Sequence, residues 1–479
     1  MNYRMIRYLL GVILIIEAVF MALPTLVAFI YGEELHPFLW TIALILCISL
    51  PLVIFKPKNT QIYAKEGFIT VAAGWILLSA FGALPFVFSG IIPKYIDAFF
   101  ETVSGFTTTG ATILTAIEGL PYGILFWRSL THWVGGMGVL VFMLAILPSA
   151  NGQTMHLMRA EVPGPTKGKL VPKMRQSSLI LYGIYVAMTL IEIALLLIVD
   201  MPLYDAAVNA FGTAGTGGFA VLNASIAGYN NPAAEWIIAI FMLLFGINFN
   251  IYFFILMGKV RDALKSEELR VYLIICALAT VLIAINTASM FDSLSDNVRA
   301  SFFQVTSIMS TSGFATVDFN LWPSFSKTIL VLLMITGACA GSTAGGLKIS
   351  RVIILVKSAL KEIRHMRRPK SVNVVRLDGE AVPSETVRSA MGYIVVYILI
   401  FLTSTLLISV DAFSFETNVS AVIATLNNVG PGFDVVGPVG NFSVFSDFST
   451  VVLSFTMLIG RLEIMPMMIL FSSIFSKRK

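Results

Sequence analysis

Charge is scarce in this chain. Only 12% of its 479 residues are Asp, Glu, Lys or Arg, whereas soluble globular domains carry about 25%. This shortage excludes a chain built of ordinary soluble domains, and the 57% of hydrophobic residues indicates a membrane protein with little mass outside the bilayer. The net charge of +5 is concentrated in particular loops. We interpret it as a topology signal and expect no nucleic-acid partner.

Cysteine and histidine are also rare. The three cysteines, Cys47, Cys276 and Cys339, lie in or beside apolar runs, and the four histidines are widely separated. An odd, scattered set of cysteines gives neither a disulfide framework nor the spacing of a metal site. No nucleophile–base pair is recognisable in the sequence. We therefore predict that the chain is not an enzyme and carries no covalent or organic cofactor.

Long apolar runs dominate what is present. A helical membrane span needs about 20 mostly apolar residues, and we assign ten spans. They cover residues 8–30, 38–55, 68–87, 124–147, 179–199, 236–257, 271–290, 328–338 with its continuation 347–360, 393–410, and 451–475. The first run is too long for a cleaved signal segment and lacks a small-residue cleavage site, so we expect it to be retained. Four further runs, 96–106, 203–213, 298–309 and 417–426, are short enough to be re-entrant.

The loops between the runs alternate in charge. Basic residues concentrate at 4–7, 56–65, 159–175, 259–270, 357–376 and 477–479, and the alternate loops are acidic. Positive loops face the cytoplasm. We therefore predict that both termini are cytoplasmic and that all four short runs enter the membrane from the outside. The densest basic cluster, 357–376, is suited to anionic lipid, and docking of a cytosolic regulator is the alternative.

Each short run ends in a strip of small or polar residues. The four strips are Thr107-Thr108-Thr109-Gly110, Ala214-Gly215-Thr216-Gly217, Ser310-Thr311-Ser312-Gly313 and Asn427-Asn428-Val429-Gly430. Non-helical backbone survives at bilayer depth only if it is buried in protein or lines a wet cavity. Four such strips around one axis would form a ring of backbone carbonyls, which is how a cation filter replaces an ion's water. Close helix packing through small residues is the structural alternative.

This repetition predicts an all-α membrane fold with ten transmembrane helices. Four pseudo-symmetric repeats, each a helix, a short pore helix and a second helix, would surround a central pore. We place the repeats at residues 67–177, 178–268, 269–384 and 385–479, after an accessory pair of helices at 1–66. Every short run enters from the same side, which favours parallel repeats and a pore over the inverted repeats of many secondary transporters.

A glycine-rich segment interrupts the eighth span. It reads Cys339-Ala340-Gly341-Ser342-Thr343-Ala344-Gly345-Gly346. Its glycines and hydroxyls would break a helix in mid-membrane. The segment shares the first half of a phosphate-binding loop, but Leu347 stands where that motif needs lysine. Simple close packing of a glycine-rich helix is the stronger alternative to a functional loop.

Several charged residues lie within spans. Arg461 and Glu463 are deep in the last span, where a charge usually faces the bundle interior or water; a buried ion pair with an acid is the structural alternative. Arg128 and His132 share one side of the fourth span near its outer end, and we interpret them as solvated interface residues, with an outer-vestibule role as the alternative. Glu17 and Glu192 also lie within spans, and the sequence suggests no role for them.

The strips in their settings resemble the Trk/Ktr/HKT superfamily of potassium transporters, from about residue 68 to the end, and the two extra N-terminal spans are similar to its Trk branch. The segments that carry the resemblance are Ser104-Gly105-Phe106-Thr107-Thr108-Thr109-Gly110-Ala111, Thr216-Gly217-Gly218-Phe219, Ser312-Gly313-Phe314 and Asn428-Val429-Gly430-Pro431-Gly432. The resemblance implies a filter formed by the backbone of Thr109, Gly110, Thr216, Gly217, Ser312, Gly313, Val429 and Gly430. It also implies that residues 339–346 obstruct the pore when it is closed, with Arg461 as an electrostatic barrier or a partner of this gate.

The function implied is that of the pore-forming subunit of a bacterial potassium uptake system in the inner membrane, with K⁺ as the transported ligand. The resemblance further implies a homodimer, a cytosolic nucleotide-binding regulatory subunit and lipid contacts. Gly110 favours potassium, because sodium-passing members often have serine there and glycine permits backbone conformations that other residues resist. A secondary transporter coupling K⁺ to H⁺ or Na⁺, and a receptor or scaffold without transport, are the alternatives.

Overall fold

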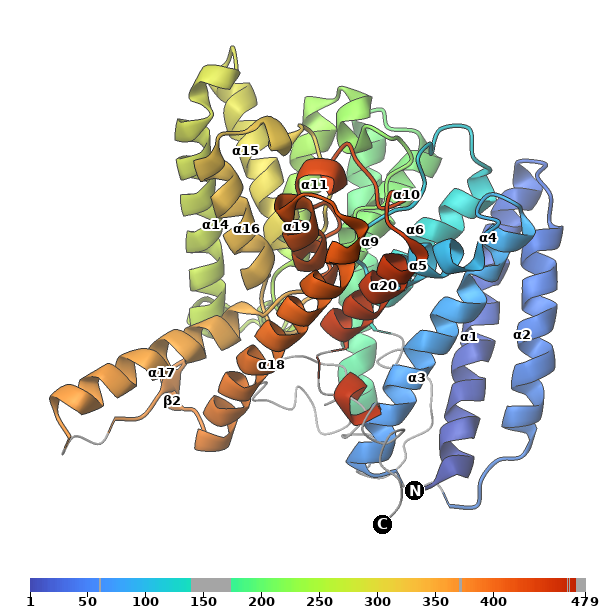
Figure 1. Cartoon of the computed structure of the whole chain (residues 1–479), viewed down its shortest axis with the longest axis horizontal. Coiled ribbons are helices and arrows are strands. Elements are labelled where there is room, and N and C mark those ends of the chain that lie inside the picture. Colours follow the sequence, from blue (N-terminus) through green and yellow to red (C-terminus); the bar gives the residue numbers. More distant parts are fainter. Residues whose placement is uncertain (60–61, 139–173, 370–372, 463, 465, 471–479) are drawn as a thin grey trace.

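The computed structural model describes residues 1–59, 62–138, 174–369, 373–462, 464 and 466–470. These residues are almost entirely helical (Figure 1). The one sheet among them is an antiparallel hairpin of β1 (Arg376–Leu377) and β2 (Glu380–Ala381). Part of the predicted fourth span, much of the basic loop at 159–175, Glu463, the end of the last span and residues 477–479 lie outside the described part.

Six described helices are long and apolar enough to cross a membrane, and a bent pair makes a possible seventh. The six are α1 (Tyr3–Ile30), α2 (His36–Ile54), α3 (Ala64–Gly82) continued by α4 (Leu84–Phe88), α9 (Met174–Ile198), α14 (Glu267–Asn286) and α18 (Ser384–Ile408). The bent pair is α11 (Pro232–Phe245) with α12 (Phe249–Leu256). Three shorter helices also lie at predicted spans: α6 (Tyr122–Gly136), α16 (Ser324–Thr336) and α20 (Asp447–Arg461).

Four half-length helices coincide with the four short apolar runs. They are α5 (Tyr95–Phe106), α10 (Leu203–Gly215), α15 (Leu294–Met309) and α19 (Phe415–Leu426). Each carries an acid in its first turn, namely Asp97, Asp205, Asp296 and Glu416. A carboxylate there is stabilised by the positive end of the helix dipole. Each helix then ends at one of the strips, so its negative end lies at the strip.

The half-length helices are packed in a closed order. Each lies against the long helices next to it in sequence and against one helix of the preceding unit: α5 against α20, α10 against α6, α15 against α11, and α19 against α16. In Figure 1, α1 and α2 lie outside this group at the right, and α14, α15 and α16 lie at the left. The first unit therefore contacts the last, although about 350 residues of sequence separate them.

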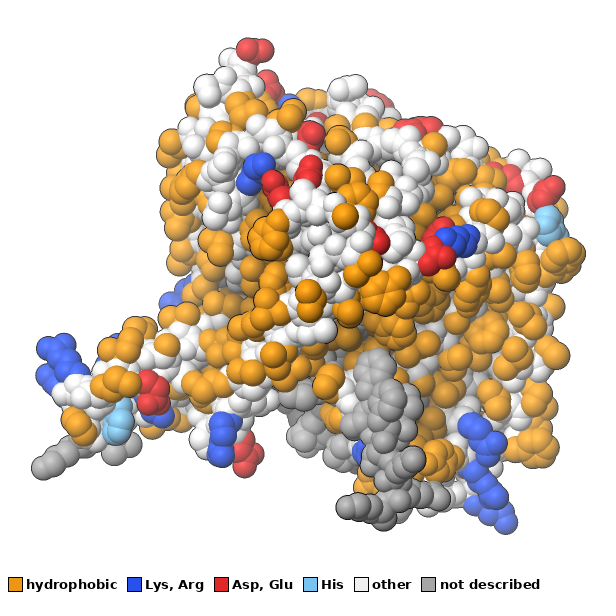
Figure 2. Space-filling view, viewed as in Figure 1, with side chains coloured by type: hydrophobic (Ala, Val, Ile, Leu, Met, Phe, Trp, Pro, Cys, Tyr) orange, Lys and Arg blue, Asp and Glu red, His pale blue; other side chains and the backbone are white. Residues whose placement is uncertain are grey.

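The remaining described elements are short, apart from α17 (Ile349–Arg367). They are α13 (Val260–Leu264) and the 3₁₀ turns η1 (Ser225–Tyr229), η2 (Ala288–Met290), η3 (Phe319–Leu321), η4 (Ser409–Asp411) and η5 (Asp434–Val436). Figure 2 shows hydrophobic side chains over the flanks, with acidic groups gathered at the upper end and basic groups at the lower end. The exposed side chains of Arg4, Arg7, Lys56 and Lys58 lie at the end where α1 begins and α2 finishes.

The predicted sixth span is broken in the structure. Between α11 and α12 the chain bends by 91°, whereas the sequence predicted one continuous run over 236–257. The bend frees backbone groups that a straight helix would pair, and the 339–346 segment satisfies them: Cys339 N–H donates to the Gly246 carbonyl at 3.1 Å, and Phe249 N–H donates to the Gly341 carbonyl at 3.0 Å. Such partners are what allow a break at membrane depth.

The predicted continuation of the eighth span also differs. Residues 347–360 were expected to resume that span, but α17 is amphipathic and is not among the helices apolar enough to cross a membrane. It buries Ile349, Ile353 and Ile354 and places Arg364 and Arg367 in its last turn. In Figure 1 it projects from the bundle at the lower left. Basic side chains at a helix C-terminus are favoured by the dipole.

Candidate functional site

All four half-length helices end in the same backbone motif. In each strip, the first residue with a left-handed backbone is not a glycine. These residues are Thr108, Thr216, Thr311 and Asn428, with φ between 54° and 60°. The next residue donates its N–H to the carbonyl five positions earlier, at 2.8–2.9 Å, in all four strips. This is the hydrogen-bond pattern of a Schellman cap. Threonine is strained in this conformation, and backbone strain of this kind clusters at functional sites.

The strips meet one another in a closed ring. A Cβ atom built on Gly110 would lie 2.0 Å from the carbonyl oxygen of Gly217, and one on Gly218 would lie 2.0 Å from that of Ser312. A Cβ atom on Gly313 would lie 2.2 Å from the Val429 carbonyl oxygen, and one on Gly430 would lie 2.6 Å from that of Thr109. Strip one therefore touches strip two, two touches three, three touches four, and four touches one. Any residue with a side chain would displace backbone at each of these contacts.

The register of the second strip differs from the predicted one. The glycines with positive φ that face the neighbouring strip are Gly110, Gly313 and Gly430. The matching residue of the second strip is Gly218, with φ of 78°, which lies one residue beyond the strip as the sequence defined it. Gly217 instead corresponds to Thr109, Ser312 and Val429, because its N–H makes the five-back bond. A sequence signal for this exists: Gly218-Phe219-Ala220 repeats Gly313-Phe314-Ala315. We matched Gly217 to Gly110 by position alone and so placed it one residue early.

A solvent-accessible vestibule opens on one side of the ring. Gly110, Gly218, Gly313 and Gly430 all line it, together with the segments that follow the first, second and fourth strips. On the strips themselves the polar groups are carbonyls, hydroxyls and amides, and strips one and four are joined by a hydrogen bond from Asn428 Nδ2 to Thr109 Oγ1 at 2.9 Å. Such oxygens suit a weakly held monovalent cation rather than a tightly chelated metal.

The glycine-rich segment lies against strips three and four. Gly345 N–H donates to Thr311 Oγ1 at 2.7 Å, and a Cβ atom on Gly345 would lie 2.3 Å from the Asn427 carbonyl oxygen. The strained Thr311 therefore presents its hydroxyl to this segment. The predicted break in the eighth span is confirmed as a non-helical stretch between α16 and α17. We call residues 337–348 the loop.

Arg461 joins the loop to the other side of the ring. Its Nη1 donates to the Thr343 carbonyl at 2.6 Å, and its Nη2 donates to the carbonyls of Gly135 and Gly136, at the end of α6, at 2.7 and 2.8 Å. The guanidinium therefore links Gly135 to Thr343. Arg461 thus places its positive charge beside the carbonyl groups at the C-terminus of α6, where a cation is favoured by the helix dipole.

Arg128 and His132 are buried, so their interpretation as solvated interface residues is wrong. Arg128 is 2% exposed and His132 is fully covered. Arg128 Nε donates to Glu101 Oε1 at 2.6 Å, and its guanidinium stacks 3.5 Å from the ring centre of Phe219. His132 Nδ1 lies 2.7 Å from the Gly105 carbonyl oxygen. Both side chains therefore hold the backbone around the first two strips, and Arg128 also lines the vestibule.

Glu17 and Glu192 are also buried. Glu17 Oε1 lies 3.0 Å from where a Cβ atom of Gly82 would be. The structure gives neither carboxyl a role in the ring.

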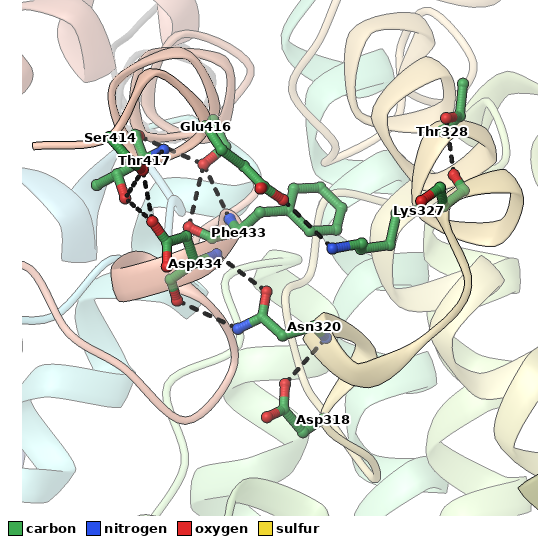
Figure 3. A network of polar contacts seen from close by, with 11 residues as sticks. Asp318, Asn320, Lys327, Thr328, Ser414, Glu416, Thr417, Phe433 and Asp434 are labelled. Carbon is green, nitrogen blue, oxygen red and sulfur yellow. Dashed lines mark hydrogen bonds and ion pairs between the residues drawn. The ribbon is translucent and has the colours of Figure 1, made fainter.

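A polar clasp on the outer side of strip four holds the segments around it (Figure 3). Asp434 accepts hydrogen bonds from the hydroxyls of Ser414 and Thr417, and it exchanges two bonds with the side chain of Asn320 at 3.0 and 3.2 Å. The hydroxyls of Ser414 and Thr417 hold the pKa of the Asp434 carboxyl below its usual range. Lys327 pairs with Glu416 nearby at 3.4 Å. The clasp fixes the start of α19 relative to the chain that follows strip four.

Two residues of this site were missed from the sequence. Gly218 had a signal in the repeated Gly-Phe-Ala segment. Glu268 had none, because its partners are Ala340 N–H at 2.7 Å and Ser350 N–H at 3.0 Å, which lie 72 and 82 residues away. A single acid at the start of a helix is ordinary in sequence, and only the fold shows what it binds.

Comparisons with known proteins agree over the whole chain. A family model described as TrkH, cation transport protein, matches residues 37–478. The Trk system potassium uptake protein TrkH of Salmonella typhimurium is 34% identical over 99% of both chains, as is that of Escherichia coli K12. The crystal structure of the potassium transporter TrkH from Vibrio parahaemolyticus superposes with a TM-score of 0.89, at 30% identity and covering all of both chains.

Proposed function

Because the chain belongs to the TrkH family of cation transport proteins, we propose that it conducts potassium into the cell as the membrane subunit of an uptake system. The observation that carries the mechanism is the closed ring of four strips. Carbonyls of Thr109, Gly217, Ser312 and Val429 each lie against a glycine of the neighbouring strip. In this proposal the strips form the filter, and their oxygens replace the water that a potassium ion loses.

Electrostatics support a cation as the transported ion. The four half-length helices direct their C-termini at the strips, and the negative end of each dipole favours a cation there. Strips one to four contain no Asp or Glu, so selection rests on carbonyl dipoles and not on a ring of carboxylates. Acidic residues at the outer ends of the half-length helices raise the local concentration of cations near the vestibule.

We propose that the fold is four pseudo-symmetric repeats with ten transmembrane helices. The closed packing order of the half-length helices supports this arrangement, with an accessory pair at residues 1–66 and repeats at 67–177, 178–268, 269–384 and 385–479. The basic lower end and acidic upper end (Figure 2) support cytoplasmic termini. We further propose a cytosolic nucleotide-binding partner, since the relatives are named as parts of a Trk system. A homodimer in contact with lipid is proposed from the family resemblance alone.

Potassium flux in purified vesicles tests the function. With a potassium gradient across the membrane, we expect a reversal potential set by potassium alone. An imposed proton or sodium gradient should leave it unchanged, because a filter of carbonyls has no group that must bind a second ion. A shift of the reversal potential with either gradient would indicate a coupled secondary transporter. An absence of flux in vesicles that contain well-folded protein would indicate a receptor or scaffold.

The loop is proposed as the gate beneath the filter. Gly345 contacts strips three and four, and Arg461 ties Thr343 to α6. Residues 339–346 therefore obstruct the path of an ion that has passed the ring, with the guanidinium as an added electrostatic barrier. In this proposal, opening requires that these bonds break together.

Shortening the loop should raise steady-state flux. Deleting part of 341–346 removes the contact with Thr311 and leaves the guanidinium of Arg461 without its Thr343 acceptor, so we expect potassium uptake into deficient cells to increase several-fold. The measurement is initial rubidium uptake, normalised to the amount of protein in the membrane. Replacing the exposed Gly183 of α9, which has nothing within 4 Å of its Cβ position, by alanine provides a control that should not change uptake. Unchanged uptake by a normally expressed deletion would contradict the gate.

A further inference from the structure

Both ends of the loop are bound by one carboxylate. Glu268 is the second residue of α14, and it is 8% exposed. Its Oε1 accepts hydrogen bonds from Ala340 N–H, near the start of the loop, and from Ser350 N–H, in the first turn of α17. A charged acceptor makes stronger hydrogen bonds than a neutral one. The loop is therefore closed at its base by this side chain, together with the backbone bond from Ile349 N–H to the Ala338 carbonyl at 3.1 Å.

The residue before it links α14 to the surface of the protein. Glu267 Oε1 pairs with Lys357 Nζ of α17 at 2.5 Å, and its N–H donates to Asp378 in the β1–β2 turn at 2.7 Å. Lys357 also donates to the Arg376 carbonyl at 2.9 Å. These groups are partly exposed. We call Glu267, Lys357, Arg376 and Asp378 the junction.

The junction and the loop are thus attached to adjacent residues of one helix. The buried Glu268 holds the loop, and the partly exposed Glu267 holds α17 and the hairpin. Ser350 belongs to the same helix as Lys357, so a displacement of α17 relative to α14 that breaks the Glu267–Lys357 pair also pulls Ser350 away from Glu268. The loop would then keep its contacts with Thr311 and Arg461 and with the backbone between α11 and α12, but it would lose the bond that ties it to α14 and α17.

We propose that Glu268 is the positioning residue that keeps the loop beneath the strips and transmits movement of the junction to it. This inference rests on the proposed function of the loop as a gate. A partner that binds the exposed end of α17 and turns it away from α14 would release the loop through Glu268. The carboxylate acts through hydrogen bonds to backbone and touches no transported ion.

Two variants separate this role from general destabilisation. Glu268→Ala removes the acceptor for both N–H groups. Ser350→Pro removes one donor and leaves Glu268 intact, and proline is tolerated in the first turn of a helix, where its N–H has no intrahelical partner. Glu268→Gln retains an acceptor oxygen at the same place and should largely preserve the arrangement. Glu362→Ala changes an exposed acid of α17 and serves as the matched control.

The readout is the rate at which N-ethylmaleimide modifies Cys339. This thiol is fully buried in the loop, and in a background with Cys47→Ala and Cys276→Ala it is the remaining cysteine. We expect Ser350→Pro to raise the rate about tenfold, the change that corresponds to losing one hydrogen bond to a charged group, and Glu268→Ala, which loses both bonds, to raise it further. Glu268→Gln and Glu362→Ala should stay near the parent rate.

Potassium flux measured on the same vesicles distinguishes the two proposals. Higher flux together with faster modification in Glu268→Ala and Ser350→Pro supports the inference. Unchanged modification in both variants would overturn it, even if the parent protein conducts potassium. An equal increase in Glu362→Ala would overturn it too, because the effect would then not depend on Glu268. No flux from the parent protein would overturn the proposed function, while Cys339 would still report whether Glu268 holds the loop.

Discussion

Gly313→Ala should abolish most potassium flux while leaving the protein folded. The φ angle of Gly313 is 81°, and a Cβ atom there would lie 2.2 Å from the Val429 carbonyl oxygen and 2.8 Å from Pro431 Cδ. The left-handed conformation alone costs an alanine about 1–2 kcal/mol, and the clash forces strip three or strip four to move. We expect flux in vesicles to fall at least about tenfold, which corresponds to destabilising the intact ring by about 1.4 kcal/mol relative to disrupted forms.

A matched control separates the clash from the strain. Gly119 has a similar φ of 86°, but nothing lies within 4 Å of its Cβ position. Gly119→Ala therefore carries the same conformational cost without touching the ring, and its flux should stay near that of the parent. Gly218→Ala should behave like Gly313→Ala, since its Cβ atom would lie 2.0 Å from the Ser312 oxygen. If Gly313→Ala has the same flux as the parent protein, strip three is not part of the filter.

The strips and the half-length helices could be predicted because their signals are local. Helix length follows from the extent of an apolar run, and a strip of Thr, Ser and Gly at bilayer depth must be buried or wet wherever it occurs. The break at 339–346 was predicted for the same reason. Arg461 was marked as a functional residue because a charge so deep in a span is costly. Its contacts with α6 could not be predicted.

The predictions that were wrong concern features that depend on contacts between distant segments. An apolar run has the same composition whether it is straight or bent, so the break between α11 and α12 could not be seen, and its freed backbone groups are paired by a loop some 90 residues later. The continuation over 347–360 failed because its apolar residues lie on one face of an amphipathic helix. Arg128 was placed in solvent because Glu101, its partner, lies in another helix.

Arg128→Met should destabilise the protein more than other losses of an ion pair. The side chains of Arg128 and Glu101 are 2% and 0% exposed. Glu101 also accepts bonds from Thr112 Oγ1 and Ile113 N–H, just after strip one, while Arg128 donates to the Ala220 carbonyl, just after strip two. Removing the guanidinium leaves a buried carboxylate without its counter-charge, which typically costs about 3–5 kcal/mol. We expect a large fall in the unfolding temperature of the solubilised protein.

Arg299→Met provides the matched control. Arg299 pairs with Glu235 at 2.7 Å, but the two side chains are 19% and 12% exposed, so water can replace the lost partner and the expected cost is smaller. Arg128→Lys should not restore stability, because an ammonium group cannot bond the carboxylate and the carbonyl while stacking on Phe219. The double variant Glu101→Gln with Arg128→Met should recover part of the loss, since the two side chains are coupled. Equal losses for Arg128→Met and Arg299→Met, or a strictly additive double variant, would mean that the pair does not hold the first two strips in place.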